Sequence, residues 1–299
     1  MDTADLDALK QQRDGMARRL REFERQSAYT GLSTEPHITL QIQDLKRELR
    51  LIDNQICECL PRDARRLALA TYAGGLLADP LYTAFDWSGS FPEGRPAATT
   101  WTGGLWADLR GLKQQCDQRA QTKLAVHMKA HLSVGLAFGF LFSQQTTYDL
   151  WIAAGQGQWW CTSSQPDADD RLVWDRQVLD PEQPDVSLEI WASSARNDAI
   201  DRWLVERPLP LRERHCCALE PAKVMGSAHA VAIALAIGTY IRSHLRVAQR
   251  TPRRIHLFMA APIPLAVMIG RMLNACGPVQ CYDYDKLDGT YVPACELKG

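Results

Sequence analysis

Residues 254–274 read RIHLFMAAPIPLAVMIGRMLN, and this stretch decides the fold. It opens as a short apolar run typical of a buried strand and continues as an apolar stretch of helical length. Two prolines mark the turn between them, and Pro264 suits the first turn of a helix, where a missing N–H costs nothing. Most strand-to-helix turns use Gly, Ser, Asp or Asn. The small apolar turn AAPIP (260–264) therefore raises the hypothesis that something flat lies against it.

An earlier segment, residues 123–161, repeats this pattern when it is shifted forward by 131 residues. Strand, turn, helix and hairpin then agree in a single register. The matched positions include Met128 with Met259, Ala130 with Ala261, Gly139 with Gly270, Trp151 with Tyr282 and Trp160 with Tyr291. We interpret this agreement as an internal duplication, in which each half is an α/β unit with apolar strands covered by helices.

The rest of the body alternates strands and helices. Strands are expected over 81–88, 123–130, 186–194 and the start of 254–274, and hairpins over 148–154 with 158–163 and 279–285 with 290–297. Helices are expected over 105–120, 131–142, 198–205 and 222–244. The polar, proline-containing segment 163–185 predicts a linker, and 207–214 predicts a turn segment. The two halves are expected to span residues 63–180 and 181–299.

Residues 1–62 have a different texture and predict an antiparallel helical hairpin. Gly31 and Pro36 separate its two helices. The apolar positions of the second helix follow a coiled-coil spacing, at Ile42, Leu45, Leu49, Ile52 and Ile56. The hairpin is either a simple packing or oligomerisation arm or an adaptor that meets the helices of another protein. Both interpretations predict a partner surface.

Composition excludes several classes of protein. The chain has 299 residues and a net charge of −1, without the basic excess that wrapping a long nucleic acid requires. Its nine cysteines, odd in number and without paired zinc spacing, indicate reduced thiols in the cytoplasm and no metal site. The longest apolar run, Val224–Ile241, contains Ser, His and Thr and predicts a buried helix rather than a membrane span.

Three predicted strand ends carry the candidate site, in the turns 128–133, 191–198 and 259–264. Ligands of open α/β sheets bind beyond the carboxyl ends of the strands, where the free N–H groups of helix N-termini attract anions. Ser193 and Ser194 are donors, and Arg196 is a candidate contact for a phosphate or a base. Together with an apolar floor at 260–262, the three turns favour a compact polyanion with several phosphates.

The sequence leaves open the roles of a lysine, a histidine and a tyrosine. Lys129 and His131 lie at the first turn, where a ligand role and a packing role are both possible, whereas His256 is expected in the core. Tyr282 either stacks on a base or fills the core. There is no nucleophile elbow, P-loop or H-E-x-x-H motif. The chain is therefore interpreted as a receptor rather than an enzyme.

Several segments resemble one known family. IHLFMAAPIPLAVMIGRMLNACGPVQCYDYD (255–285) with YVPACEL (291–297) closely resembles the C-terminal half of SAVED domains. The segments TWTGGLWADL, HLSVGLAFGFLF and GQWWCTSS resemble its N-terminal half. SAVED domains are sensors of cyclic oligonucleotides in bacterial anti-phage defence, in CBASS and type III CRISPR systems. The resemblance implies two fused CARF-like Rossmannoid halves, in agreement with the internal repeat.

The resemblance also implies a ligand and partners. Cyclic tri- or tetranucleotides, often cyclic triadenylate, are the expected ligands, and ligand-driven head-to-tail stacking into an oligomer or filament is the expected response. Where relatives carry an effector module, this chain has the hairpin, so a separate effector protein is expected to act in trans. A ring nuclease built on Lys129 and His131, or a structural adaptor acting through the hairpin, is the alternative. The candidate ligand-binding residues are Lys129, His131, Ser133, Trp191, Ser193, Ser194, Arg196, Ala260, Ala261, Pro262, Pro264 and Tyr282.

Overall fold

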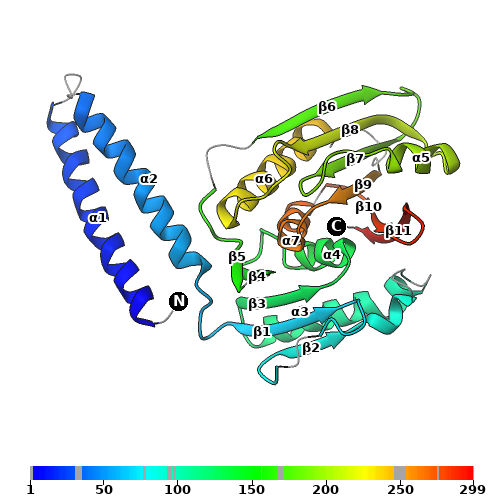
Figure 1. Cartoon of the computed structure of the whole chain (residues 1–299), viewed down its shortest axis with the longest axis horizontal. Helices are drawn as coiled ribbons and strands as arrows, with labels where there is room; N and C mark the ends of the chain where they lie inside the picture. Colours follow the sequence, from blue (N-terminus) through cyan, green and yellow to red (C-terminus); the bar gives the residue numbers. More distant parts are fainter. Residues whose placement is uncertain are drawn as a thin grey trace.

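The computed structural model describes residues 3–30, 36–76, 79–92, 96, 99–155, 157–166, 171–245, 254–274 and 276–298. It contains a helical hairpin that projects from a body of two β-sheets (Figure 1). The α/β fold class expected from the sequence is confirmed.

The hairpin consists of α1 (Thr3–Thr30) and α2 (Pro36–Glu58), as predicted. Leu45 and Ile52 of the predicted seam are buried, while the exposed faces of both helices are charged. The ion pairs Arg13–Asp53 (2.6 Å) and Lys46–Glu24 (2.9 Å) tie α1 to α2 across the surface. Gly31, predicted to end the first helix, lies outside the described residues.

The first sheet has the strand order β2-β1-β3-β4-β5 and is parallel except for its last strand. Its strands are β1 (Arg65–Ala70), β2 (Thr83–Asp86), β3 (Lys123–Lys129), β4 (Asp149–Gly155) and β5 (Gln158–Cys161). A π-helical turn at Trp101–Leu105 leads into α3 (Trp106–Gln118), and α4 (Leu132–Leu141) follows β3. Strand β1 lies inside this sheet, between β2 and β3, although no strand was predicted there.

The second sheet has the order β11-β10-β9-β7-β8-β6. Its strands are β6 (Leu172–Val178), β7 (Asp185–Trp191), β8 (Leu211–Leu219), β9 (Ile255–Ala260), β10 (Val279–Asp285) and β11 (Thr290–Leu297). Its helices are α5 (Ala199–Glu206), α6 (Ser227–Tyr240) and α7 (Ile263–Met272). The predicted buried helix over 222–244 is therefore α6, packed in the core of the body.

Two sequence predictions are wrong in this sheet. Residues 172–178, predicted as part of a linker, form the edge strand β6, and the predicted turn over 207–214 becomes β8 at Leu211. Strand β6 looks like a linker in sequence because five of its seven residues are exposed at the sheet edge. Strand β6 belongs to the second sheet although it precedes residue 180, after which the second half was expected to begin. The division of the body at residue 180 remains a prediction.

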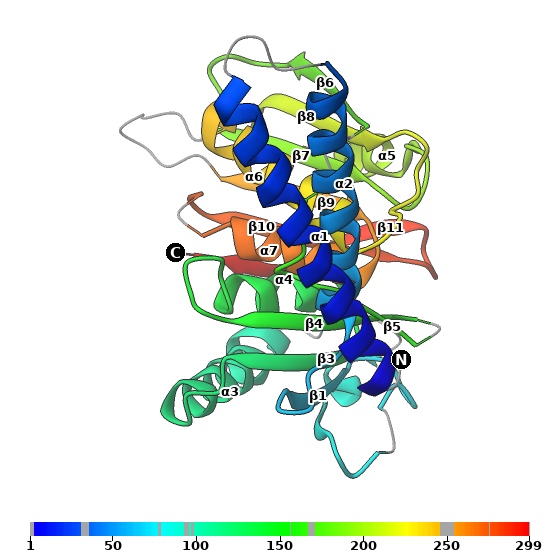
Figure 2. The same cartoon turned by 90° about the vertical axis from the view of Figure 1, so that its left-hand side faces the viewer.

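The internal duplication is visible in three dimensions. The unit β3-α4-β4-β5 corresponds to β9-α7-β10-β11, and α4 and α7 lie between the two sheets (Figures 1 and 2). The two helices pack directly: a Cβ at Gly139 would lie 2.0 Å from the carbonyl oxygen of Val267, and one at Gly270 would lie 2.3 Å from that of Leu136. These contacts are equivalent under the shift of 131 residues, so a pseudo-two-fold axis relates the halves.

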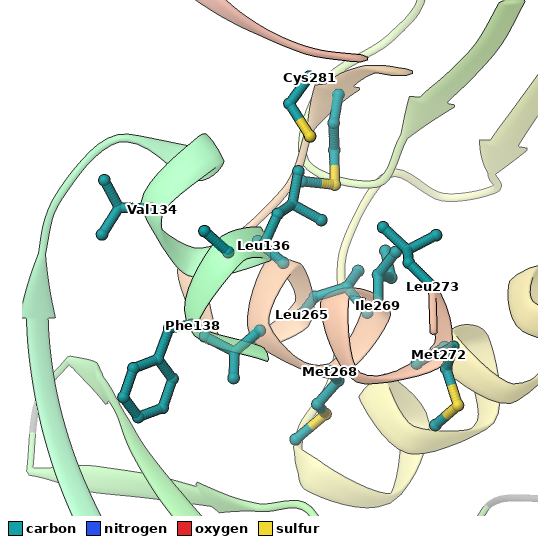
Figure 3. Packing of buried hydrophobic residues seen from close by; sticks show 14 of the residues in the cluster. Val134, Leu136, Phe138, Leu265, Met268, Ile269, Met272, Leu273 and Cys281 are labelled. Carbon is teal, nitrogen blue, oxygen red and sulfur yellow. The ribbon is translucent and has the colours of Figure 1, made fainter. Parts of the chain in front are cut away.

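One continuous core results from this packing. It takes side chains from both sheets and from the helices between them. Figure 3 shows Leu136 of α4 beside Leu265 and Ile269 of α7, with Met272 near α6. A second, smaller cluster lies on the other face of the second sheet and includes Trp203 of α5.

Candidate functional site

Helices α4 and α7 run in the same direction and begin side by side. The neighbours of Gly135 include Ala266 and Ile263, whereas those of Gly139 include Val267 and Arg271. Partner positions thus rise together along both helices, which places both N-termini at one end of the body. We call this end the shared edge, formed by residues 129–133, 192–196 and 260–264, where β3, β7 and β9 end.

Backbone hydrogen bonds join two of the three turns at the shared edge. The N–H groups of Ala192 and Ser193 both donate to the carbonyl oxygen of Ala260, at 2.8 and 3.1 Å. The third turn, 129–133, lies at the same end of the body, because α4 begins there and runs parallel to α7. The structure therefore brings the three predicted turns together, as the sequence analysis expected.

Seven of the twelve candidate residues are at least partly open to solvent at the shared edge. The exposed ones are Lys129, Ser193, Ser194 and Arg196, and the half-buried ones are Ala260, Ala261 and Pro262. The backbone of Arg196 lies in the shared edge, but its guanidinium reaches back over the α5 face of the second sheet. There it lies 3.7 Å from the exposed carboxylate of Asp175, and its charge acts on Glu189 and Cys216. Exposed pairs of this kind contribute little, so the guanidinium is held only weakly in this position.

The His131 side chain is buried at the shared edge, where it holds neighbouring segments in position. Its ring lies between Tyr72 and Phe91, with ring centroids 4.4 and 4.6 Å away, and the residue is 5% exposed. Its Nδ1 pairs with the hydroxyl of Thr71 at 2.7 Å, and its backbone N–H donates to the same oxygen. The imidazole therefore holds the end of β1 against the start of α4.

Ser133 is engaged within the protein as well. Its N–H and its hydroxyl donate to the two carboxylate oxygens of Asp283, at 3.1 and 2.5 Å. Burial raises the pKa of Asp283, against the effects of His131 and of the two bonds from Ser133. The position equivalent to Ser133 in the second half is Pro264, which has neither donor and is buried in α7.

Trp191 and Tyr282 do not face the shared edge. Both belong to the smaller cluster on the other face of the second sheet, with Trp203 and Phe258. The Tyr282 hydroxyl pairs with Nδ1 of His256 at 2.8 Å, and burial raises the pKa of Tyr282. Trp191, a candidate ligand-binding residue, therefore packs in the core. Tyr282 fills the core, one of the two roles that its sequence position left open, and His256 lies there as predicted.

Sequence reasoning missed Tyr72, which lies just beyond β1. One face of its ring covers His131, and the residue is 41% exposed. Burial raises the pKa of its hydroxyl, and the carboxylate of Asp283 adds to this effect. The run RLALATYAGG (66–75), a short apolar strand that ends at an aromatic residue and two glycines, is the signal that would have found it.

A comparison with known protein families identifies the family of this chain. Residues 108–297, nearly two thirds of the chain, match the model of SAVED, the SMODS-associated and fused to various effectors sensor domain. The chain belongs to the SAVED family. A comparison with curated proteins gave no significant match.

Solved structures of SAVED proteins share the fold. The Acinetobacter baumannii Cap4 SAVED/CARF-domain containing receptor, solved with the cyclic trinucleotide 2'3'3'-cAAA, matches with a TM-score of 0.64 and 17% identity over 87% of this chain and 56% of that one. Its complex with 3'3'3'-cAAA gives a TM-score of 0.63 at 17% identity, over the same shares of both chains. The Moraxella osloensis Cap4 receptor gives 0.59 and 14%, over 86% and 54%. This SAVED chain thus spans just over half the length of those receptors.

Lys129 and His131, the two residues of the nuclease alternative, lie in different surroundings in the SAVED body. Lys129 is exposed, while the His131 imidazole is stacked between two rings and bonded to Thr71. Within the described ranges, no group of three or more His, Cys, Asp or Glu residues is placed to hold a metal ion. No helix in those ranges is both long and apolar enough to cross a membrane.

Proposed function

We propose that this SAVED protein is a receptor for a cyclic oligonucleotide second messenger, cyclic tri- or tetra-adenylate, in bacterial anti-phage defence. The observation that carries the proposal is the shared edge, where two parallel, pseudo-symmetric helices begin beside three strand ends. The cyclic trinucleotides in the Acinetobacter Cap4 receptor structures support the same class of ligand.

The chemistry of the shared edge suits a ring of phosphates. The N–H groups of Leu132 and Ile263, which open α4 and α7, and the two helix dipoles attract anions. The second position contributes no N–H to a ligand in either helix, because that of Ser133 donates to Asp283 and Pro264 has none. Lys129 supplies charge at the rim, and Arg196 adds a second charge when its side chain turns from Asp175 to the ligand. Ala260, Ala261 and Pro262 form a smooth apolar floor, and the exposed side of Tyr72 offers a stacking surface for a base.

The response to ligand is proposed to be self-association, head to tail, followed by activation of a separate effector protein. The helical hairpin is the proposed contact with that effector. It is attached to the body near the end of α2, where the Trp151 indole N–H donates to the Cys57 carbonyl at 2.6 Å and the Asn54 carboxamide bonds to the backbone of Gln165. The division into hairpin, first half and second half stays part of this proposal.

The protein is proposed to bind its ligand without cleaving it. The alternative, a ring nuclease, needs a base and a cation over a phosphodiester, and His131 has its polar and aromatic contacts inside the protein. Chromatography of ligand recovered after incubation separates the two activities: a linear product would replace the receptor interpretation with the nuclease one.

The proposal is tested by calorimetric titration with cyclic tri- and tetra-adenylate, with light scattering on the same samples. Lys129→Ala and Arg196→Ala each remove one charged contact, for which a loss of roughly 10- to 100-fold in affinity is expected. Lys123→Ala, at the opposite end of β3, and Arg254→Ala, just before β9, are matched controls.

Tyr72→Ala is expected to remove one stacked base and to weaken binding by a similar factor. Unchanged affinity in Lys129→Ala, Arg196→Ala and Tyr72→Ala would place the ligand away from the shared edge. Absence of binding to either ring size would reject the proposed ligand.

A further inference from the structure

Two cysteines meet where the helical hairpin joins the body. Cys57 lies at the C-terminal end of α2, and Cys161 is the last residue of β5, the strand beside that end of the helix (Figure 1). The indole N–H of Trp151 donates to the carbonyl oxygen of Cys57 at 2.6 Å, so the Trp151 side chain points to the end of α2. Cys161 is the cross-strand partner of Trp151, and its side chain therefore leaves the sheet on the same face. The sulfurs of Cys57 and Cys161 share a hydrogen bond there.

The two thiols differ in their access to solvent. Cys57 is half-buried and lines a groove of about 1430 Å³ between the hairpin and β5, whereas Cys161 is 0% exposed. Cys59 is half-buried in the same groove, but its thiol donates to the carbonyl oxygen of Gln55 within α2, at 3.1 Å, and burial raises its pKa. A dissolved oxidant therefore reaches Cys57 and Cys59, and it does not reach Cys161 directly.

The surroundings of Cys57 favour its thiolate form. The hydrogen bond from the Cys161 thiol lowers the pKa of Cys57, and a bond from the Ser164 hydroxyl acts in the same direction. Burial and the carboxylates of Asp149 and Glu58 oppose this shift without cancelling it. Because the thiolate is the nucleophile in thiol oxidation, Cys57 is the cysteine of the groove that is prepared to react.

We propose that Cys57 and Cys161 are a redox-active pair, which a peroxide oxidises to a disulfide that ties the hairpin to the body. The Cys57 thiolate attacks one oxygen of hydrogen peroxide, the O–O bond breaks, and a sulfenic acid forms while the departing hydroxide takes up a proton. The Cys161 sulfur then attacks the Cys57 sulfur, the S–O bond breaks, and the hydroxyl leaves as water with the Cys161 proton. Two thiols and one hydrogen peroxide thus give one disulfide and two molecules of water.

The pair does not depend on the proposed nucleotide function, because it shares no residue with the shared edge. The disulfide would join α2 to β5 beside the hydrogen bonds of Trp151 and Asn54 that already hold the hairpin. The end of α2 could then no longer separate from β5. Oxidation is therefore expected to slow amide exchange at that end of α2 roughly fivefold or more.

The experiment treats the whole folded chain with hydrogen peroxide, blocks the remaining thiols with iodoacetamide and maps disulfides by peptide mass spectrometry. A cross-linked Cys57–Cys161 peptide is expected from protein that runs as a single chain on a non-reducing gel. Thiols titrated after denaturation are expected to fall from nine to seven, by the two that form the bond. Dithiothreitol is expected to restore all nine and the original rate of amide exchange.

Cys59→Ser is the matched control, because Cys59 lies two residues from Cys57 and lines the same groove. It is expected to leave the disulfide unchanged, whereas Cys57→Ser abolishes it. Cys161→Ser keeps a hydrogen-bond donor beside Cys57 but cannot form the disulfide, so dimedone is expected to trap at least tenfold more sulfenic acid on Cys57 than in wild type. Cys281 and Cys295 are an internal control: their sulfurs also share a hydrogen bond, but both residues are 0% exposed and are expected to stay reduced.

Any of five results would overturn the proposal. Three concern the bond itself: a thiol count that stays at nine, a disulfide that joins Cys57 to Cys59 or to a second chain, and loss of the Cys57–Cys161 bond in Cys59→Ser. The fourth is oxidation of Cys281 and Cys295 at the same rate, which would mean that exposure does not select the pair. The fifth is amide exchange that stays unchanged after the disulfide has formed, which would mean that the bond does not hold the hairpin.

Discussion

Gly139→Ala tests the packing on which the shared edge depends. The new Cβ would lie 2.0 Å from the carbonyl oxygen of Val267 and 3.0 Å from the backbone nitrogen of Arg271. Ordinary contacts begin at 3.4 Å, and the obstructing atoms are backbone atoms that no rotamer change can move. Helices α4 and α7 would therefore have to separate by about 1.4 Å, the difference between 2.0 and 3.4 Å, which loses about half of the dispersion energy or more at each separated contact.

The net effect follows from two opposing contributions. Overpacking of a core typically costs 1–3 kcal/mol, and a clash with backbone belongs at the upper end of this range, about 3 kcal/mol. Alanine in place of glycine inside a helix stabilises the folded state by about 1 kcal/mol. Gly139→Ala is therefore expected to lower the free energy of unfolding by about 2 kcal/mol, or roughly 4–8 °C in Tm.

Chemical and thermal unfolding, followed by circular dichroism, measure this difference. Gly111→Ala is the matched control: Gly111 is inside α3, and a Cβ there would meet nothing within 4 Å. That variant is expected to gain up to about 1 kcal/mol. If Gly139→Ala were as stable as Gly111→Ala, α4 and α7 would not be in backbone contact, and the reasoning about the shared edge would fail.

Three further changes probe other links in the structure. A double-mutant cycle of Ser133→Ala and Asp283→Ala is expected to give a coupling energy of about 1–2 kcal/mol in unfolding titrations, because either single change leaves a buried partner unsatisfied. Burial lowers the pKa of His256 below 6.5, against the attraction of Asp185, so the unfolded chain binds a proton at a pH where the native chain does not. The free energy of unfolding is therefore expected to fall as the pH drops below about 6.5. His256→Gln is expected to flatten this dependence on pH. Asn54→Ala is expected to raise amide exchange at the end of α2 roughly fivefold, since it removes about 1 kcal/mol of hydrogen bonding to the body.

Each of these has a result that would contradict it. Additive effects in the cycle would mean that Ser133 and Asp283 do not share their hydrogen bonds. A slope unchanged in His256→Gln would assign the acid sensitivity to another group, for example His215, whose pKa burial also lowers. Exchange that stayed at the wild-type rate in Asn54→Ala would mean that the Trp151–Cys57 contact holds the hairpin alone.

The sequence predicts the duplicated part of the fold well. Strand, turn, helix and hairpin repeat with constant spacing, so the register that aligns Gly139 with Gly270 also aligns the helices around the pseudo-two-fold axis. A tight helix–helix crossing needs glycine at equivalent places on both helices, and this requirement is visible in one chain without any relative. The positions of the three turns at one edge follow from the same register.

Side-chain direction and edge strands were harder to predict. Trp191 ends β7, but strand alternation points it to the face covered by α5, and only the sheet order reveals that face. His131 stacks on Tyr72 and Phe91, which lie far away in sequence. Strand β6 carries polar residues because it is an edge, so its composition resembles that of a loop.

The asymmetry between the two halves explains the unusual proline turn. In the first half, the second residue of α4 is Ser133, and its N–H and hydroxyl both donate to the buried Asp283 of the other half. Asp283 has no counterpart, because the equivalent position in the first half is Ile152, a fully buried apolar residue of β4. A donor at the second residue of α7 would therefore find no carboxylate there. Proline removes the donor and fixes the first turn of the helix, so Pro264 is accounted for by packing. The part of AAPIP left open for a ligand is Ala260, Ala261 and Pro262.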